Sequence, residues 1–375
     1  MNFYHPNVKT VLPLLKSGRS GIIQRADAAL STALECITDS GSPESAGGRH
    51  DYFSQADYFW PNPGAPDGLP FVNRDGESWP GAFSGHRKAL RSMRTSTALC
   101  TAAYLFTGDA RYSRAAAGRL KAFFLDEETM MAPNLLYAQA ISGVCTGRGV
   151  GIIDTLHLID VPAAADILWN SGQLDAAVYD GLKAWFSAYL DWMLTHEYGI
   201  DEMNRANNHG VCWHVQAAVF ARFTGNAAAL AMCADRYKNV ILPDQMADNG
   251  SFPRELARTK PYGYSIFVLD NVVTLCYVLS AAGDNLWEFT LPDGRGVKKG
   301  LDFLYPYLAD KSSWPYHDDI AHHKDWPAAM SFMLFAAAAC GDDKWLELYS
   351  RLEKFPVNDE VRRNTAIRVP YLWLH

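Results

Sequence analysis

The chain has 375 residues and carries 34 basic against 41 acidic side chains, so its formal net charge is −7. Nearly half of the residues are apolar (49%), 13% are aromatic and 20% are charged. This composition excludes a disordered or acidic-tail protein, because such chains are poor in aromatic residues and rich in charge. It also argues against a nucleic-acid partner, since binding to a phosphate backbone needs a basic excess.

The sequence gives no indication of a membrane partner or a metal cofactor. The most apolar runs, such as Phe332–Cys340, are far shorter than the ~20 residues a helix needs to cross a bilayer. Met1–Ser20 lacks the continuous apolar stretch of a secretory signal, so we expect a cytoplasmic protein, or a periplasmic or secreted one if a leader has been removed. The seven cysteines are scattered without a CxxC pair, which argues against a disulfide framework or a structural zinc site.

From about residue 85 onward, apolar residues recur at three- and four-residue steps, which is typical of amphipathic helices. Strand-like alternation is scarce. In chain order, the predicted helices span residues 85–106, 111–124, 178–193, 210–223, 227–240, 266–282, 301–308, 328–339 and 344–352.

Three short breaks join pairs of these helices, at Thr107–Asp109, Thr224–Asn226 and Cys340–Asp343. Each contains a glycine that can end one helix, followed by a polar residue that can cap the next. Repeated antiparallel helical hairpins predict an all-α fold, either an (α/α) toroid of six or seven hairpins or a linear solenoid. We favour the toroid, as one catalytic domain over residues 1–375, because long irregular segments interrupt the hairpins.

Two of those segments, 51–84 and 127–154, are long enough to be functional loops over a cleft. The first is rich in proline and glycine around aromatic residues. Trp60 stands beside Pro61 in this loop, which makes it a candidate to contact a sugar.

The sharpest cluster of chemistry-bearing residues combines an Asn207-Asn208-His209-Gly210 run with the segment Gly250–Tyr264. The first stands where a helix begins, and helix N-termini favour anions. The second contains Arg254, Arg258, Tyr262 and Tyr264. An amide, an imidazole and a guanidinium together suit a carboxylate, and a tyrosine can donate or accept a proton.

The reaction that needs this set is β-elimination on a uronic acid polymer. Loss of the C5 proton creates an enolate-like dianion, which cationic and hydrogen-bonding groups on the carboxylate stabilise. A single tyrosine can take the proton and protonate the departing O4 when both lie on the same face of the ring.

Several runs carry a resemblance to a known family: Asn134–Ala140, Gly147–Thr155, Asn207–Gly210, Gly250–Pro253 with Glu255–Thr259, and Tyr264-Ser265. Together they resemble the alginate-lyase-like superfamily, and most closely polysaccharide lyase family thirty-eight, whose members cleave β-1,4-glucuronan or alginate. The resemblance implies an (α/α) toroid and a metal-free elimination on an anionic polysaccharide, with glucuronan placed ahead of alginate.

The resemblance also implies roles for single residues. Tyr264 would be both base and acid, and Asn208, His209 and Arg258 would neutralise the carboxylate. Tyr137, Gln139 and Arg148 would be substrate contacts. If the family motif aligns differently with this sequence, Tyr262 is the rival base and Arg254 the rival group that binds the carboxylate. Glu255 is expected to orient Arg258 or Arg254.

Three alternatives stay open from the sequence. Asp201-Glu202 or the pair Asp248 and Glu255 could serve a toroidal glycoside hydrolase that acts on uronate-containing oligosaccharides. The chain could instead bind a uronan without turnover. The loop His317–Asp325 contains metal-ligand residue types, but its spacing matches no usual site, so a polar rim is the preferred interpretation.

Overall fold

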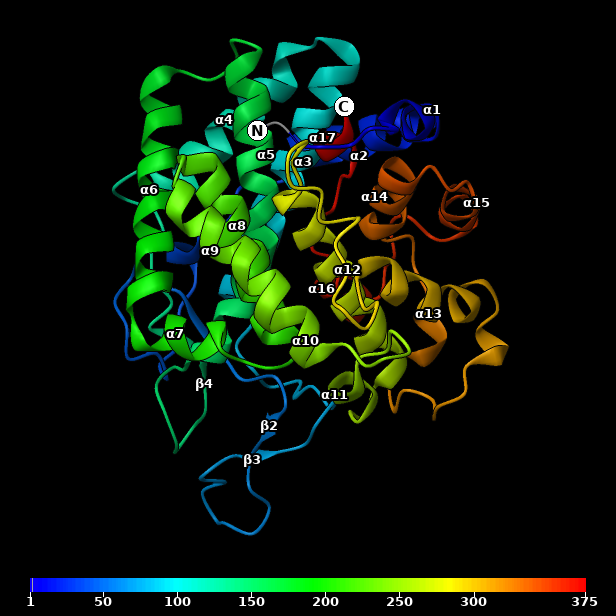
Figure 1. Ribbon diagram of the computed structural model, residues 1–375. Helices are drawn as coiled ribbons and strands as arrows, with labels where there is room; N and C mark the ends of the chain where they lie inside the picture. The colour runs from blue at the N-terminus through cyan, green and yellow to red at the C-terminus, as the bar shows by residue number, and fades with distance from the viewer. Residues whose placement is uncertain (2) are drawn as a thin grey trace. The chain divides into compact units, whose positions relative to one another are not determined.

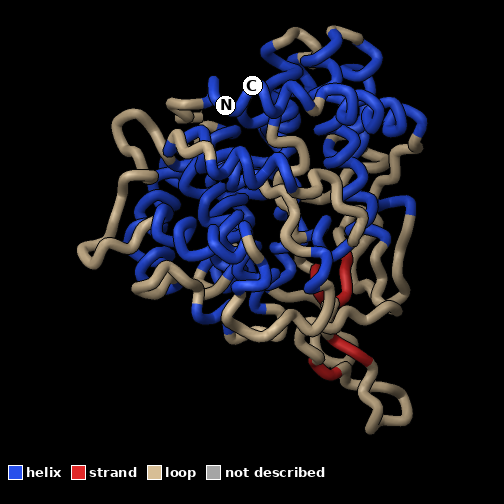
Figure 2. The backbone as a smooth tube through the Cα atoms, turned by 90° about the vertical axis from the view of Figure 1, so that its right-hand side faces the viewer, coloured by secondary structure: helices blue, strands red, loops and turns tan. Residues whose placement is uncertain are grey.

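The computed structural model describes residue 1 and residues 3–375 of the chain. Of the described residues, 58% are helical and 4% are strand, which confirms the all-α prediction. The tube view makes the same point, since only a few short segments are strand (Figure 2).

The chain divides into two compact units, which we describe separately. One comprises Gly18–Met203 and is called the 18–203 unit; the other comprises Met1–Ser17 with Asn204–His375 and is called the 204–375 unit. We predicted one catalytic domain over residues 1–375, and this stays a prediction.

In the 18–203 unit, the long helix α3 packs against both α2 and α4, and β1 pairs in parallel with β4 while β2 pairs antiparallel with β3. Its elements are α2 (Arg19–Ser31), β1 (Phe53–Gln55), β2 (Phe59–Trp60), β3 (Val72–Asn73), α3 (Gly85–Thr107), α4 (Ala110–Phe124), β4 (Tyr137–Ala140), a 3₁₀ segment (Gly149–Ile159), α5 (Asp160–Asn170), α6 (Ala176–Thr195) and α7 (Glu197–Met203).

In the 204–375 unit, the central helix α12 packs against α8, α11, α13 and α14 (Figure 1). The elements are α1 (Val8–Ser17), α8 (Asn208–Thr224), α9 (Ala227–Arg236), a π-helical turn (Tyr237–Ile241), α10 (Leu242–Gln245), α11 (Pro253–Leu256), α12 (Pro261–Leu279), α13 (Val297–Ala309), α14 (Ser331–Cys340), α15 (Lys344–Arg351), α16 (Asp359–Arg363) and α17 (Tyr371–Leu374).

The three predicted helix breaks are confirmed. Gly108, Gly225 and Gly341 adopt left-handed backbone conformations, with φ of 71°, 78° and 69°. The next helix is capped by a side chain after two of them, because Asp109 accepts from the Arg111 N–H and Asn226 from the Ala229 N–H. Local chemistry alone therefore locates these hairpin turns.

Other boundaries differ from the prediction. Helix α12 begins at Pro261 rather than residue 266, and the segment 51–84 contains three short strands. Helix α12 is also long and apolar enough to cross a membrane, but 94% of its apolar window is buried inside the structure. A helix that is apolar all round and covered on every side is typical of a protein core.

Candidate active site

The Asn207–Gly210 run forms the start of α8. Asn207 is the N-cap, and its side-chain oxygen accepts a hydrogen bond of 3.3 Å from the His209 N–H. Asn208 therefore does not serve as the cap; it is the first helical residue and is 1% exposed. A buried amide at this position needs a partner of its own.

That partner is Glu255 of α11. The two carboxylate oxygens of Glu255 accept from the backbone N–H of Asn208 at 2.7 Å and from its side-chain Nδ2 at 2.8 Å. Burial raises the pKa of Glu255, while the two Asn208 hydrogen bonds and the positive charges of Arg258 and His209 oppose that shift. Glu255 was expected to orient Arg258 or Arg254, and the Arg258 charge does act on its carboxylate. The structure adds a contact that was not expected, because the same carboxylate fixes Asn208.

Arg258 and Tyr264 are in direct contact. The Arg258 Nη2 donates to the Tyr264 Oη at 3.0 Å, and the guanidinium carbon lies 4.2 Å from the centre of the tyrosine ring. Tyr264 belongs to the first turns of α12 and is 9% exposed. The Lys260 ammonium lies 5.6 Å from the same ring centre and is ion-paired with Glu360. Two cations therefore flank the phenol on which negative charge would form.

Tyr262, the rival base, occupies a different environment. It is 0% exposed, and its hydroxyl donates to the Tyr307 carbonyl at 2.9 Å. Burial raises its pKa, so this phenol resists ionisation. A buried phenol that already donates to backbone is poorly suited to reach a substrate, which leaves Tyr264 as the stronger candidate.

Arg254, the rival clamp, ties loops together. Its Nη1 donates to the carbonyls of Ala206 at 3.0 Å and Asp244 at 2.6 Å. One guanidinium thus joins α11 to the end of α10 and to the turn that leads into Asn207 and Asn208. The contact indicates a supporting role in the placement of that turn.

A residue that the sequence analysis missed supports α8 from inside. His214 is buried, its Nδ1 lies 2.6 Å from the Gly210 carbonyl, and its Nε2 accepts from the Arg236 Nε at 2.9 Å. Burial lowers the pKa of His214 to about 4, so the ring is neutral, with a proton on Nδ1 and a lone pair on Nε2. In the sequence, His214 is marked only by its place five residues after His209. Its partner Arg236 lies 22 residues further on, so no local pattern predicts their contact.

In the 18–203 unit, Gln139 and Arg148 form a pair. Gln139 has a φ of 50°, which is uncommon for a residue other than glycine and points to a constrained position. The Arg148 Nε donates to the Gln139 carbonyl at 3.0 Å, and its Nη2 donates to the Gln139 side-chain oxygen at 3.1 Å. The Arg148 guanidinium carbon also lies 5.2 Å from the centre of the Phe59 ring.

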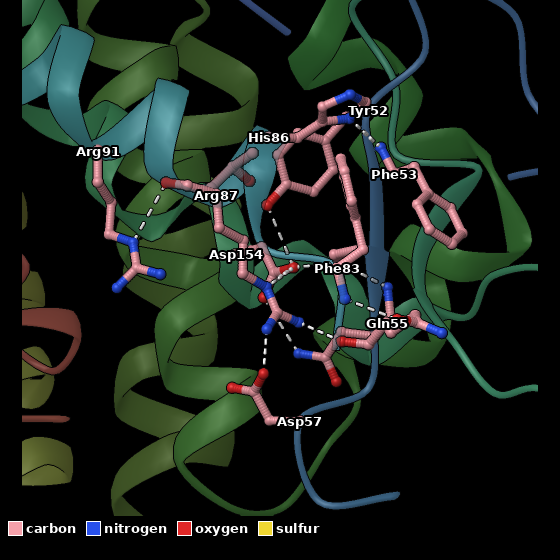
Figure 3. A network of polar contacts seen from close by, with 12 residues as sticks. Tyr52, Phe53, Gln55, Asp57, Phe83, His86, Arg87, Arg91 and Asp154 are labelled. Atoms are coloured by element: carbon pink, nitrogen blue, oxygen red, sulfur yellow. Dashed lines mark hydrogen bonds and ion pairs between the residues drawn. The ribbon is translucent and has the colours of Figure 1, made fainter. Parts of the chain in front are cut away.

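A network around Asp154 holds this pair in place. Figure 3 shows the contacts of Asp154 with Tyr52 and Arg87. The Asp154 Oδ2 accepts from the Ser54 hydroxyl at 2.5 Å and from the Arg87 Nε at 3.0 Å, and the Gln139 Nε2 donates to the Asp154 Oδ1 at 3.2 Å. Burial alone would lower the pKa of Arg87, but the charges of Asp154 and Asp57 raise it above its ordinary value. Asp154 stood at the end of a glycine-rich run, which was the one sequence signal for it.

The two aromatic candidates in this unit are engaged by their neighbours. Tyr137 lies in β4, paired with Phe53 of β1. The Trp60 indole N–H donates to the Glu77 carbonyl at 2.8 Å, and the Arg74 guanidinium carbon lies 4.7 Å from the Trp60 ring centre. One face of the Trp60 ring is thus covered by an arginine.

The chain is similar to known proteins in both sequence and structure. The sequence model of the family described as alginate lyase matches residues 37–314. The structure is similar to that of an alginate lyase from Bacteroides ovatus, with 30% identity, a TM-score of 0.81, and coverage of 98% of this chain and 93% of that one. No curated protein matches the chain.

Two further similar structures share the fold at low identity. Alginate lyase A1-III from Sphingomonas species A1 is 14% identical with a TM-score of 0.52, over 86% of this chain and 85% of that one. A variant of alginate lyase A1-III complexed with a tetrasaccharide is 13% identical with a TM-score of 0.55, over 86% of this chain and 84% of that one. These likenesses confirm the predicted fold class, the all-α (α/α) toroid.

Proposed function

The chain belongs to the alginate lyase family and is a polysaccharide lyase, and we propose that it cleaves β-1,4-linked uronans by β-elimination with Tyr264 as base and acid. The observation that carries this proposal is the contact of 3.0 Å between the Arg258 guanidinium and the Tyr264 phenol oxygen. A cation that donates to a phenol oxygen stabilises the negative charge that forms there.

The proposed step balances without an added reagent. The ionised Tyr264 takes the C5 proton of the uronate, and the electron pair moves into the ring as an enolate conjugated with the carboxylate. The C4–O4 bond then breaks as the C4=C5 bond forms, and Tyr264 returns the proton to O4. The products are a new non-reducing end with a 4,5-unsaturated uronate and a free hydroxyl on the other fragment.

The charge that appears on the carboxylate needs donors that are already in place. Asn208, His209 and Arg258 are proposed to supply them, since an amide, an imidazole and a guanidinium can each donate a hydrogen bond to the enolate-like dianion. Glu255 fixes the Asn208 amide, so that donor does not need to reorganise when charge develops. We assign Glu255 and Arg254 to positioning of these groups, and Tyr262 to the core.

A single tyrosine restricts which uronans can react. Mannuronate and glucuronate differ at C2 and share their configuration at C4 and C5, so H5 and O4 lie on the same side for one phenol. Guluronate is the C5 epimer of mannuronate, which places H5 on the other side. We therefore propose mannuronan and glucuronan as substrates and guluronan as a poor one. The named relatives are alginate lyases, which moves mannuronan ahead of glucuronan.

The 18–203 unit is proposed to contribute substrate contacts. Arg148 offers a guanidinium to a uronate carboxylate, and Gln139 offers an amide. Tyr137 and Trp60 are further candidates, with the indole of Trp60 the weaker one because Arg74 covers one of its faces. A rigid cation suits a repeating polyanion, since its pairing geometry is fixed before binding.

The test is a panel of purified mannuronan, glucuronan and guluronan, followed by ultraviolet absorbance of the unsaturated ends. We expect absorbance with mannuronan and glucuronan, little with guluronan, and no change in rate on addition of a chelator. Equal cleavage of guluronan would contradict a one-tyrosine mechanism, and reducing ends without absorbance would contradict elimination.

The glycoside hydrolase alternative receives less support from burial. Paired carboxylates must face the sugar to act as acid and as nucleophile or base. Glu255 is 1% exposed and Glu202 is 0% exposed, whereas the Asp248 side chain is 96% exposed. In each predicted pair, therefore, at least one carboxylate is buried and cannot face a sugar.

A further inference from the structure

The loop His317–Asp325, which the sequence analysis left as a polar rim, contains a carboxylate with a defined task. Asp319 is 6% exposed, and its two side-chain oxygens accept from the backbone N–H groups of Tyr262 at 2.8 Å and Gly263 at 2.9 Å. These are the first two N–H groups of α12, because Pro261 has none. The cap residue itself, Lys260, makes no side-chain capping bond.

The same loop holds the other side of the junction. The Ile320 N–H donates to the Thr259 carbonyl at 3.1 Å. Ile320 therefore bonds the chain just before Lys260, and Asp319 bonds it just after. This bonded segment connects Arg258 to Tyr264, so its conformation sets the relative orientation of the two side chains.

There is little space at this contact. A Cβ added at Gly263 would lie 3.0 Å from the Asp319 Oδ2 and 2.9 Å from the Trp326 Nε1. The absence of a side chain at Gly263 is what lets the carboxylate approach the helix end so closely. Both partners of the contact are thus adapted to it.

The loop is itself anchored. The Asp319 N–H donates to the His323 Nδ1 at 3.3 Å, and the Lys311 Nζ donates to the carbonyls of His323 and Trp326. An anion at a helix N-terminus is further favoured by the helix dipole. Asp318, by contrast, has a side chain that is 80% exposed and pairs with the His323 Nε2 at 3.1 Å.

We propose that Asp319 is a positioning residue that sets the geometry of the Arg258–Tyr264 pair by holding the first turn of α12. The inference rests on the proposed function, since it assigns catalysis to that pair. Asp319 does not touch the substrate in this account; it acts through the backbone that carries the phenol.

The test compares Asp319→Asn with Asp318→Asn, which makes the same change of charge one residue away on the exposed side of the loop. With mannuronan, Asp319→Asn should lower kcat about 10- to 100-fold with KM within about threefold, because a small displacement of a catalytic group costs rate more than binding. Asp318→Asn should keep kcat within about twofold, and both variants should keep a cooperative thermal transition.

Gly263→Ala approaches the same contact from the helix and should reproduce the kinetic signature if Asp319→Asn does not fold. A double-mutant cycle separates positioning from a general loss of structure. On an Arg258→Ala background the pair is already broken, so Asp319→Asn should then reduce kcat less than about threefold further.

Three outcomes distinguish the failures. If Tyr264→Phe abolishes turnover while Asp319→Asn and Gly263→Ala both match Asp318→Asn, the positioning role is wrong and the proposed function stands. If the fold-losses in kcat of Asp319→Asn and Arg258→Ala multiply in the double variant, the two residues act independently, and this too would overturn the positioning role. If Tyr264→Phe retains full activity, the proposed function itself fails.

Discussion

In the 204–375 unit Asn208 and Tyr264 stand in the first turns of two helices, and Arg258 lies in the segment before the second. In the 18–203 unit, by contrast, Gln139 and Arg148 are held by hydrogen bonds around one carboxylate. Asn208 opens α8 and Tyr264 lies near the start of α12. Arg148 and Gln139 depend instead on Asp154 and, through it, on Arg87.

The difference suggests a division of work. Buried carboxylates, Glu255 at the start of α8 and Asp319 at the start of α12, hold these helix starts in place. Rigid helix starts suit a reaction that builds negative charge, because the side chains they carry do not need to reorganise. A saturated network of charges fixes side chains in one orientation, which suits recognition of a repeating anion. On this view, substitutions in the 204–375 unit should lower kcat, and those in the 18–203 unit should raise KM.

The largest effect is expected for Tyr264→Phe. Loss of the phenol removes base and acid together, so kcat should fall by at least about 10³-fold. Tyr262→Phe is the matched control, since it removes a phenol oxygen bonded to the Tyr307 carbonyl, and it should keep kcat within about threefold. A larger loss in the control than in Tyr264→Phe would reverse the assignment.

Asn208→Ala and Arg258→Ala come next. Each removes one group proposed to stabilise the dianion, and kcat should fall about 10²- to 10³-fold. Steady-state kinetics on mannuronan measure this. A rise in KM at constant kcat would instead assign these residues to ground-state binding.

Glu255→Gln tests the carboxylate that orients Asn208. Glutamine keeps one acceptor for the Asn208 backbone N–H but turns an amide donor toward the Asn208 Nδ2, so the Asn208 amide must rotate. We expect a loss in kcat of about 10- to 100-fold with the fold retained, as judged by near-ultraviolet circular dichroism. Full activity would mean that the orientation of Asn208 is irrelevant to the step.

Arg148→Ala should act on binding. Loss of a cation that pairs with a uronate should raise KM about tenfold while kcat changes little. Arg111→Ala removes an exposed guanidinium that pairs with Asp109 in the same unit and serves as the control, with KM within about twofold. A loss of kcat in Arg148→Ala without a change in KM would contradict the proposed division between the units, because Arg148 would then act on the chemical step.

The smallest expected effect concerns stability against pH in the 204–375 unit. Burial raises the pKa of Asp270 to about 7, so its ionisation opposes folding and its contribution to stability falls as pH rises toward 7. The lowered pKa of His214, about 4, has the opposite sign, because protonation favours the unfolded chain as pH falls below about 6.5.

The two contributions should largely cancel in the native protein between pH 5 and 7. Urea unfolding should show stability that rises with pH in Asp270→Asn and falls with pH in His214→Gln, each by on the order of 2 kcal/mol over this range. Equal slopes in both variants would contradict these assignments.

The sequence predicted what local chemistry determines. The glycine turns at Gly108, Gly225 and Gly341 follow from residues within one helical turn, and so does the start of a helix at the Asn207–Gly210 run. The choice between Tyr264 and Tyr262 was not available locally, because it depends on the Tyr307 carbonyl, 45 residues from Tyr262.

Two supporting contacts were missed for the same reason. Glu255 contacts Asn208 across 47 positions of sequence, and Asp319 contacts Tyr262 across 57. A carboxylate that caps a distant helix looks, in sequence, like any polar loop residue. The resemblance predicted the reactive groups, which stays a prediction, while the structure was needed to find the contacts that hold them.

The fate of the C5 hydrogen tests the central claim most directly. With mannuronan deuterated at C5, the native protein should release deuterium to water at the same rate as unsaturated ends appear. Tyr264→Phe should release none, although it still binds the polymer. Chain cleavage with the deuterium retained at C5 would contradict proton abstraction by Tyr264.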